Sequence, residues 1–177
     1  MAIPLGSEAG PVVRAAALPV DASFEEFFDA ERVRLFGVLA LMSRNRAEAE
    51  EVMQDAFLKV WERWDRVSTM ESPAGFLYRT ALNLYRKRLR RAAVALRKAT
   101  QLLPGDDPLE EVEARDEIAR LLGGLTVRER EAIVLTSYLG YPAEEAGRLL
   151  GIRASTVRVL TTRARASIRR TSERRQP

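Results

Sequence analysis

The sequence predicts an all-α protein in which an acidic flexible linker joins two small helical domains. Apolar residues recur at helical spacing along most of the chain, and no stretch alternates as a strand would. One cluster of helix-breaking residues, Leu103 to Pro108, interrupts this pattern. A length of 177 residues suits two small domains. We therefore predict a disordered N-terminal tail at 1–22, a first domain at 23–93, the linker at 94–111 and a second domain at 112–172.

The first domain is expected to hold three main helices. Ser23 and Glu26 have the spacing of a capping box, in which each side chain bonds the backbone of the other residue. The second helix carries an apolar stripe that steps by three and four from Ala49 to Trp64, opposite a charged face. The pair Ser72-Pro73 reads as the cap and first residue of the third helix. Its predicted buried residues are Phe76, Leu77, Ala81, Leu84 and Leu89.

The second domain is expected to be a compact set of shorter helices. One helix lies around Val112 to Leu122, and Thr126 with Glu129 forms a second capping box. That box opens a helix that continues through Leu139, and two short helices then flank Gly151. We find no internal repeat.

The composition excludes several classes of function. Without cysteine or histidine, the chain cannot form a disulfide, an ordinary zinc site or a histidine-dependent catalytic triad. No glycine-rich phosphate loop is present, and adjacent acidic pairs such as Glu110-Glu111 project in different directions from a helix. We expect a non-enzyme with no cofactor and no metal. No apolar run is long enough for a membrane span, and no secretory signal is recognisable, which favours a cytoplasmic protein without membrane insertion.

The charges fall into basic, acidic and basic blocks. Residues 79–98 hold eight Lys and Arg and no acid, whereas residues 99–120 hold seven acids and two arginines. Residues 146–177 hold nine arginines and one acid. A single basic run is often only a solvated face, but two such runs on helices of separate domains favour a nucleic-acid partner.

Residues 142–165 have the pattern of a helix-turn-helix. Ala146 and Gly147 are small enough for two helices to cross closely, and Gly151 suits the left-handed residue that ends the first helix. The alternative is an ordinary helical hairpin, but few hairpins in a core expose so much arginine. The exposed positions of the second helix are suited to base edges and phosphates. They are Arg153, Ser155, Thr156, Arg158, Thr162, Arg163 and Arg165.

Three stretches in this order resemble the extracytoplasmic-function (ECF) branch of bacterial RNA polymerase sigma factors. RAEAEEVMQDAFLKVWERW (Arg46 to Trp64) is similar to the family's core-binding helix. AGFLYRTALNLYRKRLRR (Ala74 to Arg91) is similar to its promoter-melting helices, and Leu125 to Ile168 to its C-terminal helix-turn-helix. The resemblance implies a sigma region 2 helical bundle followed by a region 4 helix-turn-helix. It also implies a non-catalytic subunit that binds core polymerase and directs promoter-specific initiation.

The resemblance also implies roles for individual residues. Region 4 would read the −35 element of promoter DNA, region 2 would bind and melt the −10 element, and an anti-sigma factor is a further expected partner. Contact with the clamp helices of the largest polymerase subunit would come from Glu48, Glu51, Gln54, Asp55 and Lys59. The −10 contacts would be Ser68, Ser72, Phe76, Tyr78, Arg79, Asn83, Arg86, Lys87 and Arg90, with Tyr85 as a further ring on which bases stack.

The sequence departs from the family pattern at a few sites, and other functions stay open. Leu82-Asn83 replaces a common Arg-Asn pair, and Pro142 and Arg153 stand where serine is common. Phe76 also fits a core position. A conventional helix-turn-helix regulator, with residues 24–91 as a sensing or dimerising domain, is the main alternative and would bind duplex DNA unaided. An RNA-binding adaptor is disfavoured because no RNA-binding module is recognisable.

Overall fold

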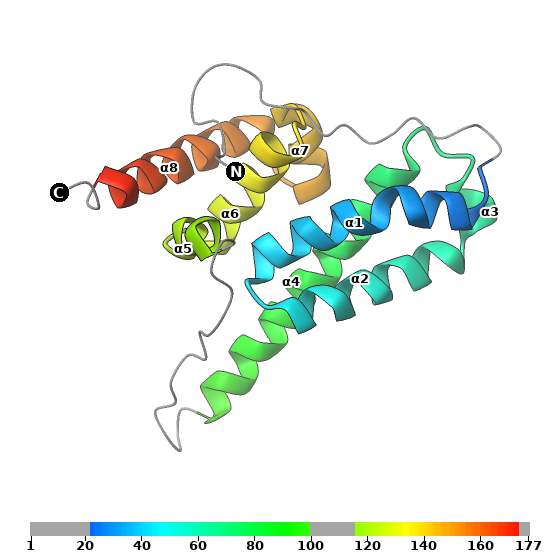
Figure 1. Ribbon diagram of the computed structural model, residues 1–177, viewed down its shortest axis with the longest axis horizontal. Coiled ribbons are helices and arrows are strands. Elements are labelled where there is room, and N and C mark those ends of the chain that lie inside the picture. Colours follow the sequence, from blue (N-terminus) through cyan, green and yellow to red (C-terminus); the bar gives the residue numbers. More distant parts are fainter. Residues whose placement is uncertain (1–21, 100–115, 174–177) are drawn as a thin grey trace.

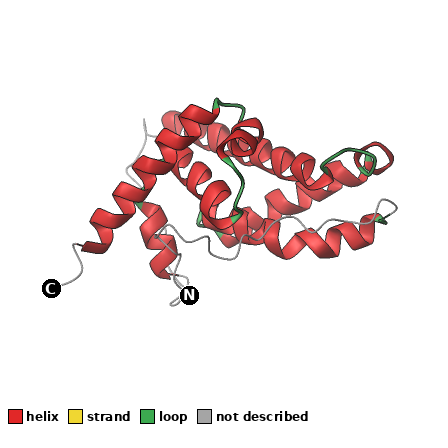
Figure 2. Cartoon of the chain, turned by 90° about the horizontal axis from the view of Figure 1, so that it is seen from above, coloured by secondary structure: helices red, strands yellow, loops and turns green. Residues whose placement is uncertain are grey.

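The computed structural model describes residues 22–99 and 116–173, and every regular element in these two ranges is helical (Figures 1 and 2). The predicted all-α class is therefore confirmed. No described helix is long and apolar enough to cross a membrane. The predicted tail and most of the predicted linker fall outside the described ranges. The last helix of the first domain continues through Ala99, into the segment predicted as linker.

The first domain packs α1, α2 and α4 together, with the single-turn α3 at one end (Figure 1). The predicted capping box is confirmed, since Ser23 and Glu26 bond each other's backbone at the start of α1. Ser72 caps α4 as predicted, because its Oγ accepts from the Gly75 amide at 3.0 Å. The bounds are Phe24–Ser43 for α1, Arg46–Trp61 for α2, Trp64–Val67 for α3 and Pro73–Ala99 for α4.

An aromatic cluster closes the end of this bundle where α1 begins and α2 ends. The Phe28 and Phe57 ring centroids lie 4.7 Å apart, and Trp64 lies 5.0 Å from Phe27 and 5.6 Å from Phe24. Phe28 meets Phe57, and Phe24 meets Trp64, edge to face, and contacts of this kind add to the free energy gained by burying the rings. The cluster fixes the angle between α1 and α2, and so the direction in which the outer face of α2 points.

The buried face of α4 differs from the prediction. Its fully buried residues include Tyr78, Leu82 and Tyr85, whereas the predicted Phe76, Leu84 and Leu89 are only partly buried. The α4 helix packs against α1 and α2 on one side and against α7 of the second domain on another. More of its circumference is therefore buried than the prediction, which considered only the first domain, had allowed for.

The second domain consists of short helices around the long α8. The predicted capping box of Thr126 and Glu129 is confirmed at the start of α6. The helix predicted to run on to Leu139 changes to a π-helix, η1, after Ile133. The bounds are Asp116–Gly123 for α5, Val127–Ile133 for α6, Val134–Tyr138 for η1, Ala143–Leu150 for α7 and Ala154–Glu173 for α8.

The two domains contact each other through α1 and α4 on one side and α5, α6, η1 and α7 on the other (Figure 1). The carbonyl oxygen of Met42, near the end of α1, accepts from the Tyr85 hydroxyl at 2.9 Å and from Arg130 Nη1 at 2.7 Å. Arg130 also donates to the Leu122 and Leu125 carbonyls at 3.1 and 3.2 Å. This buried arginine therefore satisfies backbone groups of both domains.

A buried acid, Glu31, lies on the α1 side of the same contact. Its Oε2 accepts from the Tyr78 hydroxyl at 3.2 Å, Arg34 lies 3.6 Å from Oε1, and the Tyr78 ring meets Tyr141 of the second domain edge-on. Burial raises the pKa of Glu31 above its ordinary value of 4.5, and the Arg34 charge and the Tyr78 hydrogen bond only partly offset this. The folded chain therefore holds a proton on Glu31 more tightly than the unfolded chain does.

This shift predicts a pH-dependent effect of Glu31→Gln. Because the folded-state pKa is raised, the parent loses stability as pH rises from the ordinary carboxyl value through the raised one. An amide has no charge to desolvate and still accepts from Tyr78. The melting temperature of Glu31→Gln minus that of the parent should therefore become more positive as the pH rises from 4.5 to about 8, as followed by circular dichroism. A difference that is constant with pH, or that falls, would contradict this assignment.

Candidate polymerase and nucleic-acid interfaces

The helix-turn-helix has the close crossing that the sequence predicted. Gly151 ends α7 with φ of 66°, the left-handed conformation expected of it. A Cβ on Gly147 would lie 2.7 Å from the backbone oxygen of Ile152, so only glycine fits there. Pro142 is the N-cap of α7, and Arg153 directly precedes α8. The small residues thus bring α7 against α8 and fix which face of α8 points outward.

All seven predicted −35 contacts lie on the exposed surface. Val157 and Ala164 of α8 are buried in the core of the domain. The polar and cationic side chains on the opposite side of α8 therefore point away from the domain. Two of the arginines have partners within the domain. Arg158 forms an ion pair with Glu144 of α7, and Arg165 donates to the Ser137 hydroxyl at 3.3 Å. Glu144 is exposed and Ser137 is partly covered, and both contacts lie at the surface of the domain, so neither prevents α8 from approaching DNA.

The predicted core-binding residues lie along α2, and a cation of α4 holds two of them. Glu51, Gln54 and Lys59 are exposed, whereas Glu48 and Asp55 are partly covered. Arg88 bonds the carboxylates of both Glu51 and Asp55, the latter at 2.9 Å, and these bonds raise its pKa. Burial likewise raises the pKa of Glu48. The acidic face of α2 is therefore partly neutralised and tied to α4.

Two apolar residues on this face were missed by the sequence analysis. Trp61 was assigned to the buried stripe, but its side chain is 59% exposed, and Leu58 is 52% exposed. They follow Glu51 and Gln54 at helical spacings of three and four, so all four residues share one side of α2. In the sequence, the apolar repeat runs from Ala49 to Trp64 without a break. In the structure, α2 ends at Trp61, and the chain turns there before α3 begins. Trp64 reaches the core from α3, and Trp61 is left outside.

The residues predicted for the −10 element divide into an exposed group and a group held inside the protein. Ser72, Arg79, Asn83, Lys87 and Arg90 are exposed, Ser68 and Phe76 are partly covered, and Ser68 donates to the Asp65 carbonyl at 3.3 Å. Tyr78 and Tyr85 lie in the core at 1% and 2% exposure, so in this conformation neither ring can stack on a base. Burial raises the pKa of Tyr85 to about 12, which keeps its hydroxyl a hydrogen-bond donor.

The exposed −10 group continues along α4 past the first domain. Lys87 and Arg90 line an open groove of about 400 Å³ together with Arg91, Val94 and Ala95. Arg91 was not among the predicted contacts, although the basic run of the sequence includes it. The groove presents three cations side by side with no acid in its lining.

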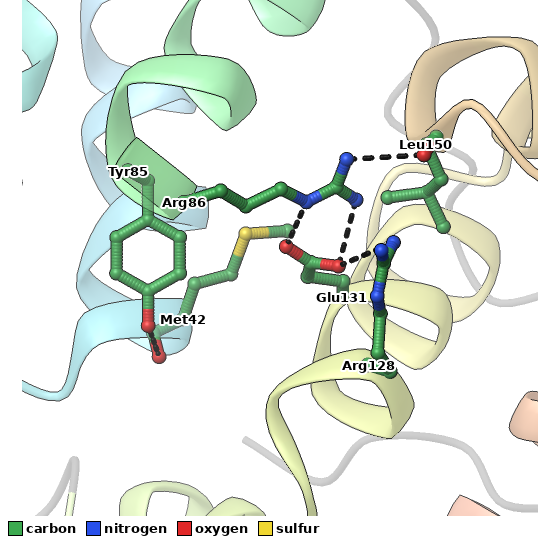
Figure 3. Close-up of polar contacts among 6 residues, drawn as sticks. All are labelled: Met42, Tyr85, Arg86, Arg128, Glu131 and Leu150. Atoms are coloured by element: carbon green, nitrogen blue, oxygen red, sulfur yellow. Dashed lines mark hydrogen bonds and ion pairs between the residues drawn. The ribbon is translucent and has the colours of Figure 1, made fainter. Parts of the chain in front are cut away.

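Arg86 lies elsewhere, in the contact between the two domains (Figure 3). Its Nε and Nη2 each donate to Glu131 of α6 at 2.7 Å, and its Nη1 donates to the Leu150 carbonyl at 3.0 Å. Glu131 is fully buried, and Arg128 Nη1 lies 3.8 Å from its Oε2, the oxygen that also accepts from Arg86 Nη2. The predicted DNA contact is thus engaged by a carboxylate in this conformation, an arrangement that the sequence did not indicate.

These features define a helical protein of two domains, of which the second is a helix-turn-helix with a cationic outer helix. Residues 27–94 match the family model for sigma-70 region 2, and residues 115–168 match that for sigma-70 region 4. The RNA polymerase sigma factor NccH of Alcaligenes xylosoxydans is 31% identical over 78% of this chain and 77% of its own length. The ECF RNA polymerase sigma factor SigM of Mycobacterium tuberculosis is 29% identical over 84% and 76%.

The fold agrees with these matches. The sigma factor RpoE of Bartonella quintana, solved with the anti-sigma factor NepR, superimposes with a TM-score of 0.71 at 19% identity, covering 86% of this chain and 98% of the other. CnrH, solved with the cytosolic domain of CnrY, gives a TM-score of 0.62 at 24% identity, with coverage of 86% and 89%. The chain belongs to the ECF family of RNA polymerase sigma factors, which are non-catalytic subunits of the transcription machinery.

Proposed function

We propose that this sigma factor binds core RNA polymerase through α2, reads the −35 element through α8 and binds and melts the −10 element through α4. The observation that carries the proposal is the outward row of hydroxyl and guanidinium groups formed by Arg153 and six residues of α8, all of which the sequence predicted to be exposed. Such groups contact base edges when a helix-turn-helix places its second helix in the major groove. Sequence-specific reading is therefore assigned to the second domain.

The polymerase contact combines an apolar anchor with polar neighbours. Trp61 and Leu58 are large, exposed and adjacent to Gln54, Lys59 and Glu51 on α2. Tryptophan is enriched among the residues that dominate binding energy, and surrounding polar residues exclude water around such an anchor. We place the clamp helices of the largest polymerase subunit on this face. Arg88 would position the Glu51 and Asp55 carboxylates toward them.

The −10 contact relies on phosphates more than on stacked rings. Arg79, Lys87 and Arg90 are exposed on α4, and Arg91 extends them along the groove. Cations that contact phosphates stabilise separated strands in a salt-dependent manner. Phe76 and Asn83 remain candidates for base contacts, whereas Tyr78 and Tyr85 support the fold. An anti-sigma factor is a further proposed partner, in line with the complexes in which both structural relatives were solved.

Reconstitution with purified core polymerase tests the proposed function. The full chain should bind core polymerase and give transcripts that start at a fixed distance downstream of a −35 and −10 pair selected from a random promoter library. The chain without core polymerase should select no such pair. Binding of one duplex sequence by the free chain, with no effect on polymerase, would instead identify a conventional regulator.

A further inference from the structure

The contact between the domains is incompatible with simultaneous reading of both promoter elements. Arg86 of α4 bonds the carbonyl of Leu150, and only about 15 Å of extended chain can separate Leu150 from Ala154, where α8 begins. The centres of the −10 and −35 elements are about 25 base pairs apart, or about 85 Å at 3.4 Å per base pair. The domains must therefore separate before α4 and α8 can occupy the two elements together.

The contact also engages one of the residues assigned to DNA. The planar guanidinium of Arg86 meets both oxygens of Glu131, in the paired geometry with which arginine also binds phosphate. The Arg86 side chain is 15% exposed and that of Glu131 is fully buried. Glu131 thus occupies the position that a phosphate would take on Arg86, and it pairs there with a cation of the other domain.

We propose that Glu131 is an intramolecular competitor of promoter DNA: its carboxylate holds Arg86 in the closed molecule, and Arg86 becomes available to the −10 strand when the domains separate. The inference rests on the proposed assignment of Arg86 to DNA. Arg130 of the second domain, which donates to the Met42 carbonyl of the first, holds the same closed arrangement from a neighbouring contact. Only the open chain spans both elements, so simultaneous binding of the two elements favours the open state.

Two measurements on the full chain test this proposal. The chain contains no cysteine, so Ala47→Cys and Gly124→Cys can carry a dye pair. Both positions are exposed, and a side chain on Gly124 meets open space. Gly123, next to Gly124, lies beside Arg44 of the first domain, which is three residues before Ala47. The two dyes are therefore close together, and energy transfer is high, when the domains are closed. The second measurement is the affinity for a labelled single strand of about 12 nucleotides, within the usual range of site sizes.

Glu131→Gln should lower the energy transfer and raise strand affinity about tenfold, since loss of one partner of a buried ion pair shifts a two-state equilibrium at least that far. Adding Arg86→Ala should keep the domains open but remove the gain in affinity. Glu145→Gln is the matched control, because it removes the same charge from an acid of the second domain whose ion pair, with exposed Arg148 at 3.9 Å, lies within one helix. Unchanged energy transfer in Glu131→Gln, or an affinity gain equal to that of Glu145→Gln, would overturn the proposal.

Arg86→Lys provides an independent variant if Glu131→Gln does not fold. Lysine keeps the cation for phosphate but cannot form the two-pronged bond to Glu131 together with the bond to Leu150. Energy transfer should fall and strand affinity should rise above that of the parent, and an Arg86→Lys chain that stays closed would refute the proposal. Core-dependent transcription by the parent chain tests the proposed function separately, because it does not depend on how the free chain is held.

Discussion

Trp61→Ala is expected to weaken binding to core polymerase by about 30-fold or more, which corresponds to ~2 kcal/mol. The Trp61 side chain is 59% exposed in the free chain, so its removal leaves no cavity in the core. The free energy of unfolding should therefore change by no more than about 0.5 kcal/mol. The loss should appear in a titration of labelled core polymerase with the variant.

Two further variants test whether the loss of affinity is specific to this face of α2 or follows the removal of any exposed apolar side chain. Leu58→Ala should weaken the same complex to a smaller extent, because the leucine side chain buries less area against the polymerase than the Trp61 ring does. Val33→Ala removes an equally exposed apolar side chain, 69% accessible, from the outer surface of α1 and should leave the affinity unchanged. Normal assembly of Trp61→Ala with core polymerase would refute the assignment of this face of α2. Charge reversal of Glu51 and Asp55 is a poorer test, since it would place new cations beside Arg88.

Arg158→Ala is expected to relax the preference for one or two bases of the −35 element by about 10- to 100-fold. Arg158 lies one turn into α8, where residues of a recognition helix reach base edges, and a two-pronged contact with guanine is worth about 1–3 kcal/mol of discrimination. Its ion pair with Glu144 holds the guanidinium on the outer side of α7 and α8. Transcription of a promoter library randomised across the −35 element would measure the change.

Arg165→Ala provides the matched control, because it removes the same side chain from an exposed position two turns further along α8. Where the helix leaves the groove an arginine meets phosphates, so this variant should lower activity evenly across the library and reduce the salt dependence. Equal losses in both variants, with no change in base preference, would show that Arg158 does not read a base.

The amino-acid sequence by itself determined the local features of this protein. Both capping boxes, the Ser72 cap and the left-handed Gly151 occur where the sequence predicted them, because each depends on residues within three or four positions of one another. The outward face of α8 was predictable for a related reason. Its apolar residues repeat at one helical spacing against the other helices of the same domain, so the remaining positions had to face solvent.

Only the tertiary structure decided the features that depend on how distant segments meet. The helical pattern could not show that α2 ends at Trp61, which turns this ring outward and brings Trp64 inward from α3. It could not show that α4 packs on two domains, which buries Tyr78 and Tyr85. The partner of Arg86 is 45 residues away in the sequence. An arginine on a basic helix has the same local signature whether a phosphate or a carboxylate meets it, and only the packing of the second domain against the first brings Glu131 to that position.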